Sequence, residues 1–368
     1  MNKLREYPVI VRLTFILFFT VLVIYSLIQA KHFLYPLAIS VLFSYLLYPV
    51  ASFLEYKARF PRVLAVLISV LLFLIITAGA FNILINQIQK LIEDETVQQH
   101  AGDNLKSLQM FVYEHLNVTP EMQTEWLKEK AASFFDAQGE AKTLVMKIVG
   151  AVEAVLFIPI FTFFMLFFRD RGEKFIHKLA ERRHSELAET LIKQISKVTI
   201  KYVTGVTIVV MILAVSHSIA LKIIGVRYPL VLGLITASFS FIPYFGTIVS
   251  GIVPVAFTLV AQDNPYIALA VALYYITISL IDHNILTPSI VGGKVHLNPF
   301  ITILSIIVGA TVWGIPGMII VVPSIAVVKI ICDNIDSLKP FGYILGVDKG
   351  GLTIKKITDF FLRKGKQN

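Results

Sequence analysis

Residues 226–260, VRYPLVLGLITASFSFIPYFGTIVSGIVPVAFTLV, decide the fold. The stretch holds two apolar runs, 230–242 and 247–260, and the sequence Pro-Tyr-Phe-Gly at 243–246 separates them. At 1.5 Å per helical residue, each run covers only about 20 Å of a hydrocarbon core that is roughly 30 Å thick. Each run is therefore as apolar as a membrane span but too short to cross a membrane alone.

A second broken stretch lies nearer the C-terminus. The runs 300–312 and 318–331 flank the sequence Trp-Gly-Ile-Pro-Gly at 313–317. Each broken stretch is either a helical hairpin that enters and leaves on one face of the membrane, or a single kinked span. We favour two broken helical hairpins, because a proline or glycine break between short apolar halves is a feature of transporter binding sites.

The composition agrees with a membrane protein. Of the 368 residues, 56% are apolar and 15% are charged, and the mean hydropathy is +0.76. Ordinary soluble domains do not need this much apolar surface. The net charge of +9 fits Lys and Arg in cytoplasmic segments better than a nucleic-acid partner. The single cysteine, Cys332, excludes an intramolecular disulfide and a cysteine metal cluster.

Longer apolar runs predict the remaining spans of an all-α integral membrane protein. About six full transmembrane helices are expected, at 13–30, 33–54, 63–86, 148–168, 203–224 and 267–281. If both broken stretches cross the membrane as kinked helices, the chain has eight spans instead. Only residues 31 and 32 separate the first two runs, which predicts a tight helical hairpin between them.

The polar segments predict the topology. Residues 90–147 are acidic, with apolar residues at a helical period, so we expect a small helical extracytoplasmic module in which Thr119 and Pro120 start a second helix. Residues 169–202 are basic and carry the apolar stripe of an amphipathic cytoplasmic helix. Both termini are expected in the cytoplasm. The expected segments are 1–89 (helices 1–3), 90–147 (module), 148–168 (helix 4), 169–202 (amphipathic helix), 203–331 (transport core with broken segments 230–260 and 300–331) and 332–368 (cytoplasmic tail).

Three blocks of the sequence resemble a known family. They are VRYPLVLGLITASFSFIPYFG at 226–246, NILTPSIVGGKVHLNPF at 284–300 and VGATVWGIPGMIIVVPSIAVV at 308–328. These blocks are similar to the signature blocks of the autoinducer-2 exporter family, also called the PerM-type permeases. The resemblance implies a multi-pass permease of the bacterial cytoplasmic (inner) membrane that exports the quorum-sensing signal autoinducer-2, while some members resemble sodium or lithium/proton antiporters.

Two positions depart from the family pattern. Ser240 stands where the family often has an acidic residue before the Ile-Pro-Tyr motif, which weakens the case for cation coupling there. Thr247 stands where a proline commonly follows the glycine.

The breaks themselves are the candidate substrate pathway. A break in mid-membrane frees backbone groups that a solute can satisfy, although a tight turn without a transport role explains it equally well. If both breaks meet at the midplane, helix N-termini with partial positive charge and helix C-termini with partial negative charge face one site. Such a site suits a neutral or anionic polar solute. The pathway residues are Pro243, Tyr244, Phe245, Gly246, Gly314, Pro316 and Gly317, with Asn284 and Pro288 from the loop between the broken stretches.

Three titratable residues are candidates for ion or proton coupling. Asp282 and His283 lie with Lys294 and His296 in the expected loop at 282–299, where a charged side chain is more often an interfacial anchor than a site. Glu153 lies in or at the edge of the fourth span. In the fifth span we expect His217 to hydrogen-bond a neighbouring helix rather than bind a metal.

We find no zinc-protease, intramembrane aspartyl or phosphate-binding motif, so we expect neither an enzyme nor a cofactor. The leading hypothesis is a secondary transporter that exports a small hydrophilic solute, autoinducer-2. The alternatives are a Na+(Li+)/H+ antiporter and a non-transporting membrane scaffold. Besides the solute and membrane lipids, the expected partner is a second copy of the chain, because the amphipathic helix offers a packing face.

Overall fold

A computed structural model describes residues 8–135, 156–179, 185–262, 264–292 and 297–347. All regular elements among these described residues are helical, which confirms the all-α fold class, and five helices are long and apolar enough to cross a membrane. The chain divides into two compact units, residues 1–169 with 203–291 and residues 170–202 with 292–368.

The first unit begins with three apolar helices, α1 (Val9–Gln29), α2 (Lys31–Ser52) and α3 (Arg62–Glu93). The expected hairpin between the first two is wrong. Ala30, with φ −86° and ψ 12°, is the only residue between them, and its amide still bonds the carbonyl of Ser26. One residue near the right-handed helical region bends a chain but cannot reverse it.

Polar contacts hold the turn after α2 and the start of α3 to the end of the fourth apolar helix, Leu156–Phe167, and to Arg169 just beyond it. The π turn Phe53–Lys57 that ends α2 carries Glu55, whose Oε2 lies 2.5 Å from Nη2 of Arg169. Arg62 donates to the carbonyl of Leu166 at 3.3 Å. Leu47, Val66 and Leu166 form a buried core beneath these contacts.

The described part of the acidic segment, residues 90–135, is largely helical, as predicted, and residues 136–147 lie outside the described part. α3 continues beyond its apolar run to Glu93, and α4 (Glu95–Leu116) and α5 (Pro120–Phe135) follow. Asp94 caps α4 by accepting hydrogen bonds from the amides of Thr96 and Val97, which satisfies donors that a helix leaves free at its start. The prediction that a helix starts at Pro120 is confirmed.

The described part of the basic amphipathic segment contains two helical elements, and residues 180–184 between them lie outside the described part. α7 spans Arg169–Leu179, and α8 spans Ser185–Ile224. α8 contains no proline, so nothing ends the helix where the amphipathic part passes into the fifth apolar run. The amphipathic helix and that expected span are therefore one element.

Three shorter apolar helices follow in the first unit: α9 (Pro229–Phe239), α10 (Phe245–Ala261) and α11 (Pro265–Ile281). We expected a loop from 282, but the helix continues through a π turn, Asp282–Leu286, into α12 (Thr287–Ile290). Pro288 lies inside α12 and has no amide for the carbonyl of Asn284, so the wider turn before it accommodates the missing bond.

The second unit contains α13 (Pro299–Asn334) and α14 (Lys339–Leu345). Part of the expected tail at 332–368 is ordered, because α14 folds back along the end of α13. The amide of Asn298 bonds the carbonyl of Leu345 at 2.9 Å, and Gly342 lies close to the carboxylate of Asp333. Residues 348–368 lie outside the described part.

Candidate functional site

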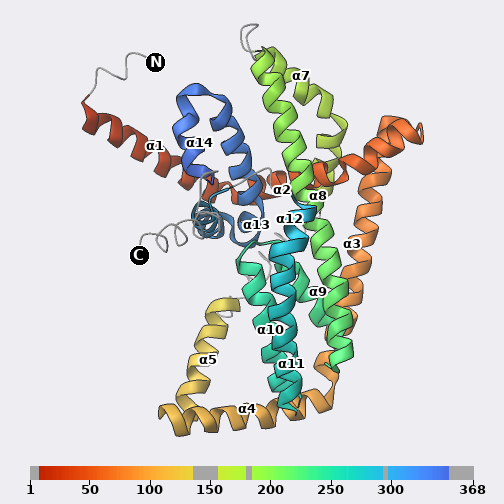
Figure 1. The fold of residues 1–368 in the computed structure, drawn as a ribbon, viewed down its shortest axis with the longest axis vertical. Coiled ribbons are helices and arrows are strands. Elements are labelled where there is room, and N and C mark those ends of the chain that lie inside the picture. The colour runs from red at the N-terminus through yellow and green to blue at the C-terminus, as the bar shows by residue number, and fades with distance from the viewer. Residues whose placement is uncertain (1–7, 136–155, 180–184, 263, 293–296, 348–368) are drawn as a thin grey trace, which may run out of the picture. The chain divides into compact units, whose positions relative to one another are not determined.

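The first broken stretch is a helical hairpin, the α9–α10 hairpin, whose two arms pack along each other (Figure 1). The turn between its arms covers residues 240–244, slightly before the predicted break at 243–246. A Cβ atom on Gly246 would lie 1.9 Å from the carbonyl oxygen of Phe239. Only glycine allows the two arms to approach this closely at the tip.

The backbone of the tip is unusual. Tyr244 has φ 63° and ψ −54°, a conformation that non-glycine residues rarely adopt. The amides of Ile242 and Gly246 bond carbonyls within the turn, at 2.9 and 2.8 Å. Among the described residues, no bond reaches the carbonyls of Ser240 and Phe241. These carbonyls are acceptors that water or a solute can fill.

The side chains of Tyr244 and Phe245 project from the tip. Tyr244 is 40% exposed and Phe245 is 46% exposed, whereas Gly246 is buried between the arms. Pro243 is half-buried in the turn. The tip therefore offers one phenol hydroxyl, one apolar ring and free carbonyls to a ligand.

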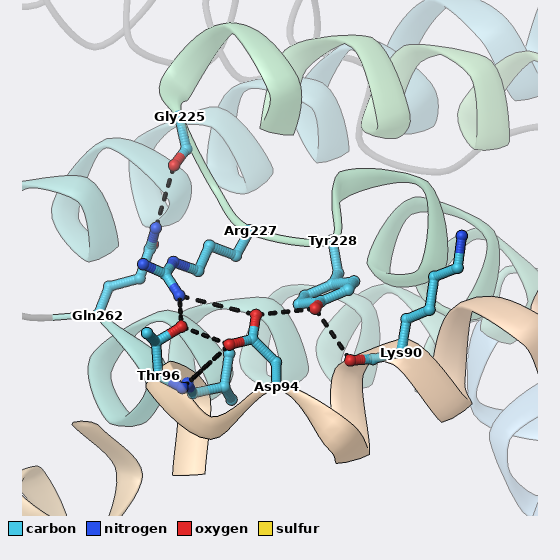
Figure 2. A network of polar contacts seen from close by, with 8 residues as sticks. Lys90, Asp94, Thr96, Gly225, Arg227, Tyr228 and Gln262 are labelled. Carbon is cyan, nitrogen blue, oxygen red and sulfur yellow. Dashed lines mark hydrogen bonds and ion pairs between the residues drawn. The ribbon is translucent and has the colours of Figure 1, made fainter. Parts of the chain in front are cut away.

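The base of the hairpin is held by polar contacts, which Figure 2 shows. The hydroxyl of Tyr228, the residue before α9, donates to Asp94 Oδ2 at 2.8 Å and to the carbonyl of Lys90 at 3.0 Å. Nη1 of Arg227 lies 3.7 Å from the same carboxylate oxygen and donates to Thr96 Oγ1. These contacts fix the start of the hairpin to the junction of α3 and α4.

The end of the hairpin is tied to the same place. Nδ2 of Asn104, on α4, donates to the carbonyls of Val260 and Gln262 at 3.1 Å each. Gln262 in turn donates to the carbonyl of Gly225 at 3.0 Å (Figure 2). The hairpin therefore starts and ends beside α4, the helix of the acidic module.

The charge at this base is stabilised locally. The hydroxyls of Thr96 and Tyr228, together with the amides of Val97 and Thr96, lower the pKa of Asp94 from 3.8 to about 2. The hydrogen bond to Asp94 raises the pKa of the Tyr228 phenol. Asp94 consequently stays ionised over the whole neutral range and keeps its bond to Tyr228.

Asp282 lies near the tip of the hairpin. It is 6% exposed, and its Oδ1 accepts a hydrogen bond from the hydroxyl of Thr287 at 2.7 Å. Ile278 and Leu286, about one turn to either side of Asp282, pack against the same apolar cluster of α8 as Phe241 of the tip. The structure thus brings together the first break and one of the candidate coupling residues.

The other loop candidates do not join them. His283 bonds the carbonyl of Ser279 at 2.8 Å, and Asn284 bonds that of Leu280 at 2.7 Å. His283, Asn284 and Pro288 are exposed. Glu153, Lys294 and His296 lie outside the described residues.

The second break belongs to the second compact unit. Gly314, with φ 64° and ψ −140°, interrupts α13, and Pro316 follows. A Cβ on Gly317 would lie 2.0 Å from the carbonyl oxygen of Gly309. Eight residues of straight helix would separate these two glycines by about 12 Å, so the chain folds back at Gly314 into a second helical hairpin.

The base contacts of the first hairpin were missed by sequence reasoning. Asp94 followed by Thr96 is a recognisable helix-capping pattern, but no local signal connects it to Arg227 or Tyr228. The described part of the chain contains no group of three His, Cys, Asp or Glu side chains that could bind a metal ion.

Comparison with known proteins gives consistent matches. The family described as AI-2E family transporter matches residues 15–337. YrrI of Bacillus subtilis strain 168 is 27% identical over 303 residues, which cover 80% of this chain and 84% of YrrI. YueF of the same organism is 27% identical over 324 residues, 82% of this chain and 84% of YueF. Both are named as transport proteins. The AI-2 transport protein TqsA of Escherichia coli strain K12 is 36% identical over 110 residues, 30% of this chain and 32% of TqsA.

Proposed function

Because the chain belongs to the AI-2E transporter family, which matches residues 15–337, we propose that it is a secondary transporter that exports a small hydrophilic solute, autoinducer-2. The similarity to the AI-2 transport protein TqsA over 30% of the chain supports this substrate. The protein lies in the bacterial cytoplasmic membrane with both termini in the cytoplasm, and it works as a homo-oligomer.

The observation that carries the proposal is the asymmetry of the α9–α10 hairpin. Its base is fixed to α3 and α4 by hydrogen bonds of Tyr228 and Asn104. Among the described residues, the tip at 239–247 has hydrogen bonds only within the hairpin, and apolar contacts of Phe241 hold it to α8. An element fixed at one end and held by apolar contacts at the other can swing at its tip.

The chemistry of the tip suits a polyhydroxylated solute. The free carbonyls of Ser240 and Phe241 accept hydrogen bonds from hydroxyl groups, and the exposed Tyr244 can donate to an oxygen atom and accept from a hydroxyl. The hairpin starts and ends beside α4, which belongs to the expected extracytoplasmic module. The hairpin therefore enters the membrane from the extracytoplasmic side. The second hairpin, at Gly314, Pro316 and Gly317, is by itself a further candidate for contact with the solute.

A Na+(Li+)/H+ antiporter is the second candidate function, and one observation favours it. Asp282 is a buried carboxylate near the tip with a hydroxyl partner, Thr287. Intramembrane carboxylates of this kind mark ion and proton pathways. Against it, Ser240 in the tip carries no charge.

Efflux of autoinducer-2 from cells that express the chain tests the leading proposal. We expect Tyr244→Phe, which removes only the hydroxyl, to lower efflux by about tenfold, the effect of losing roughly one hydrogen bond to the solute. Gly246→Leu should abolish efflux, because its side chain cannot fit beside the carbonyl of Phe239. The matched control is Tyr266→Phe, on a tyrosine that is 77% exposed at the start of α11.

Unchanged efflux in a correctly inserted Tyr244→Phe protein would refute the site at the tip. Sodium- or lithium-driven proton flux in proteoliposomes tests the second candidate. If that flux is present and is lost in Asp282→Asn, the antiporter replaces the exporter as the function.

A further inference from the structure

A cluster of polar side chains is buried between α8, α9 and α11, along the first arm of the hairpin. His217 on α8 is 2% exposed, Thr236 on α9 is fully buried and Tyr275 on α11 is 3% exposed. Ser216 and Tyr274 complete the cluster. Histidine is the side chain whose charge changes nearest to neutral pH, and ionisable side chains inside membrane segments generally have a function.

The hydrogen bonds of the cluster are well defined. Nδ1 of His217 lies 2.9 Å from the hydroxyl of Tyr274, which lies 3.0 Å from Oγ of Ser216. The hydroxyl of Tyr275 lies 2.8 Å from Oγ1 of Thr236, which donates to the carbonyl of Leu232 at 2.7 Å. The imidazole ring also contacts the ring of Tyr275, with centroids 4.8 Å apart.

This arrangement can hold both charge states of the imidazole. In the neutral state the Tyr274 hydroxyl donates to Nδ1 and accepts from Ser216. In the protonated state Nδ1 carries a hydrogen and donates to the Tyr274 oxygen, whose own hydrogen then points to Ser216 Oγ. Rotation of the two hydroxyls makes this exchange without loss of the histidine–tyrosine hydrogen bond.

Among the described residues, no carboxylate lies within ion-pairing distance of His217. The contacts of His217 are with Tyr274 and Tyr275 from α11, and these tyrosines in turn bond Ser216 from α8 and Thr236 from α9. Of these, only the two tyrosine phenols titrate, and both are neutral near pH 7. A buried unpaired charge is unfavourable, so a proton on His217 favours a conformation that admits water to the cluster.

The first arm of the hairpin closes this cluster. A Cβ on Gly233 would lie 2.3 Å from Oγ of Ser218, the residue next to His217, so α9 and α8 are in close contact here. Thr236, one turn further along α9, bonds Tyr275. Water can reach His217 from this side when α9 moves away from α8 and α11.

We propose that His217 is a proton-binding site that couples the α9–α10 hairpin to the pH gradient across the membrane. The neutral imidazole takes one proton from water, no electrons are exchanged, and the charge favours the state in which the hairpin has moved. This inference rests on the proposed function, because it assigns an energy source to the same hairpin movement.

The proton site is tested first by NMR of the full chain in lipid nanodiscs with 15N-labelled histidine. We expect one histidine signal that titrates when the pH is lowered from 8 to 4 and is absent in His217→Asn. The asparagine keeps a hydrogen-bonding group near the position of Nδ1 but cannot take up a proton. If the signal assigned to His217 does not titrate, the proposal is overturned.

The coupling is tested by maleimide labelling of the tip, with Tyr244→Cys in a Cys332→Ser background. The labelling rate is divided by that of the exposed control Tyr266→Cys at the same pH, which cancels the pH dependence of the thiol itself. We expect this ratio to change by at least about threefold between pH 8 and pH 4 in this background. The ratio should not depend on pH once His217→Asn is added, while Tyr274→Phe, which keeps the imidazole, should retain a pH response with a displaced midpoint.

A pH response that persists in His217→Asn, or its absence in the parent, would overturn the coupling. Neither result would contradict the proposed export of autoinducer-2, because efflux can take place without a proton gradient. Conversely, absent efflux with a pH-dependent tip would refute the substrate and leave the proton site standing.

Discussion

The hydroxyl of Tyr228 donates a hydrogen bond of 2.8 Å to Oδ2 of Asp94, a residue 134 positions earlier in the chain. This bond connects the start of the α9–α10 hairpin to the cap of α4, and Arg227 reinforces it from 3.7 Å (Figure 2). If the α9–α10 hairpin moves at its tip, its base must stay fixed. These polar contacts at the base, outside the apolar segments, provide that fixed end.

The first prediction concerns pH. The pKa of Asp94 is about 2 in the folded protein and close to 3.9 in an unfolded chain. The bonds to ionised Asp94 therefore stabilise the fold fully above about pH 4, and this stabilisation is lost as the pH falls toward 2. We expect the difference in melting temperature between wild type and Asp94→Asn to be constant from pH 7 to pH 5. A difference that disappears by pH 6 would contradict the assignment.

The second prediction concerns the second hairpin. Gly317→Ala places a Cβ 2.0 Å from the carbonyl of Gly309, and overpacking of this kind costs about 1–3 kcal/mol or more. The free energy of unfolding in mixed micelles measures the loss. Gly79→Ala is the control, because its Cβ meets nothing within 4 Å, and it should be neutral or slightly stabilising. Equal stability of both variants would argue against a folded-back α13.

The third prediction concerns Thr236. Thr236→Val leaves the hydroxyl of Tyr275 buried without its partner, which costs about 1–3 kcal/mol of unfolding free energy. Thr277→Val removes a comparable hydroxyl that is exposed and bonds only the carbonyl of Leu273. We expect its effect to be within about 0.5 kcal/mol. If Thr236→Val is equally mild, Tyr275 has another acceptor.

The fourth prediction concerns topology. With two hairpins, the end of α12 lies on the cytoplasmic side, whereas eight spans place it outside. We expect Ser289→Cys, at an exposed position in a Cys332→Ser background, to react with a membrane-impermeant maleimide only from the cytoplasmic side. A cysteine at the start of α11, Asn264→Cys in the same Cys332→Ser background, should react with the same reagent only from outside the cell. The reverse pattern at Ser289 would establish the eight-span arrangement.

Local sequence properties were sufficient to predict the helices and the breaks. Apolar runs of span length predict helices, because a backbone in lipid must satisfy its own hydrogen bonds. Pro243, Gly246, Gly314 and Pro316 end or interrupt helices through their own backbone chemistry, so both breaks were found within a few residues. The start of α5 at Pro120 was predictable for the same reason.

Tertiary structure decided which of these parts meet. Asp282 reads as an interfacial anchor in the sequence, and only the helical continuation through 282–290 and its packing against α8 bury it near Phe241. The bond between Tyr228 and Asp94 and the cluster around His217 join residues on different helices. Hydrophobic periodicity specifies that a helix forms and which face is apolar, but it does not specify a partner, because any apolar face can pack against lipid or another helix.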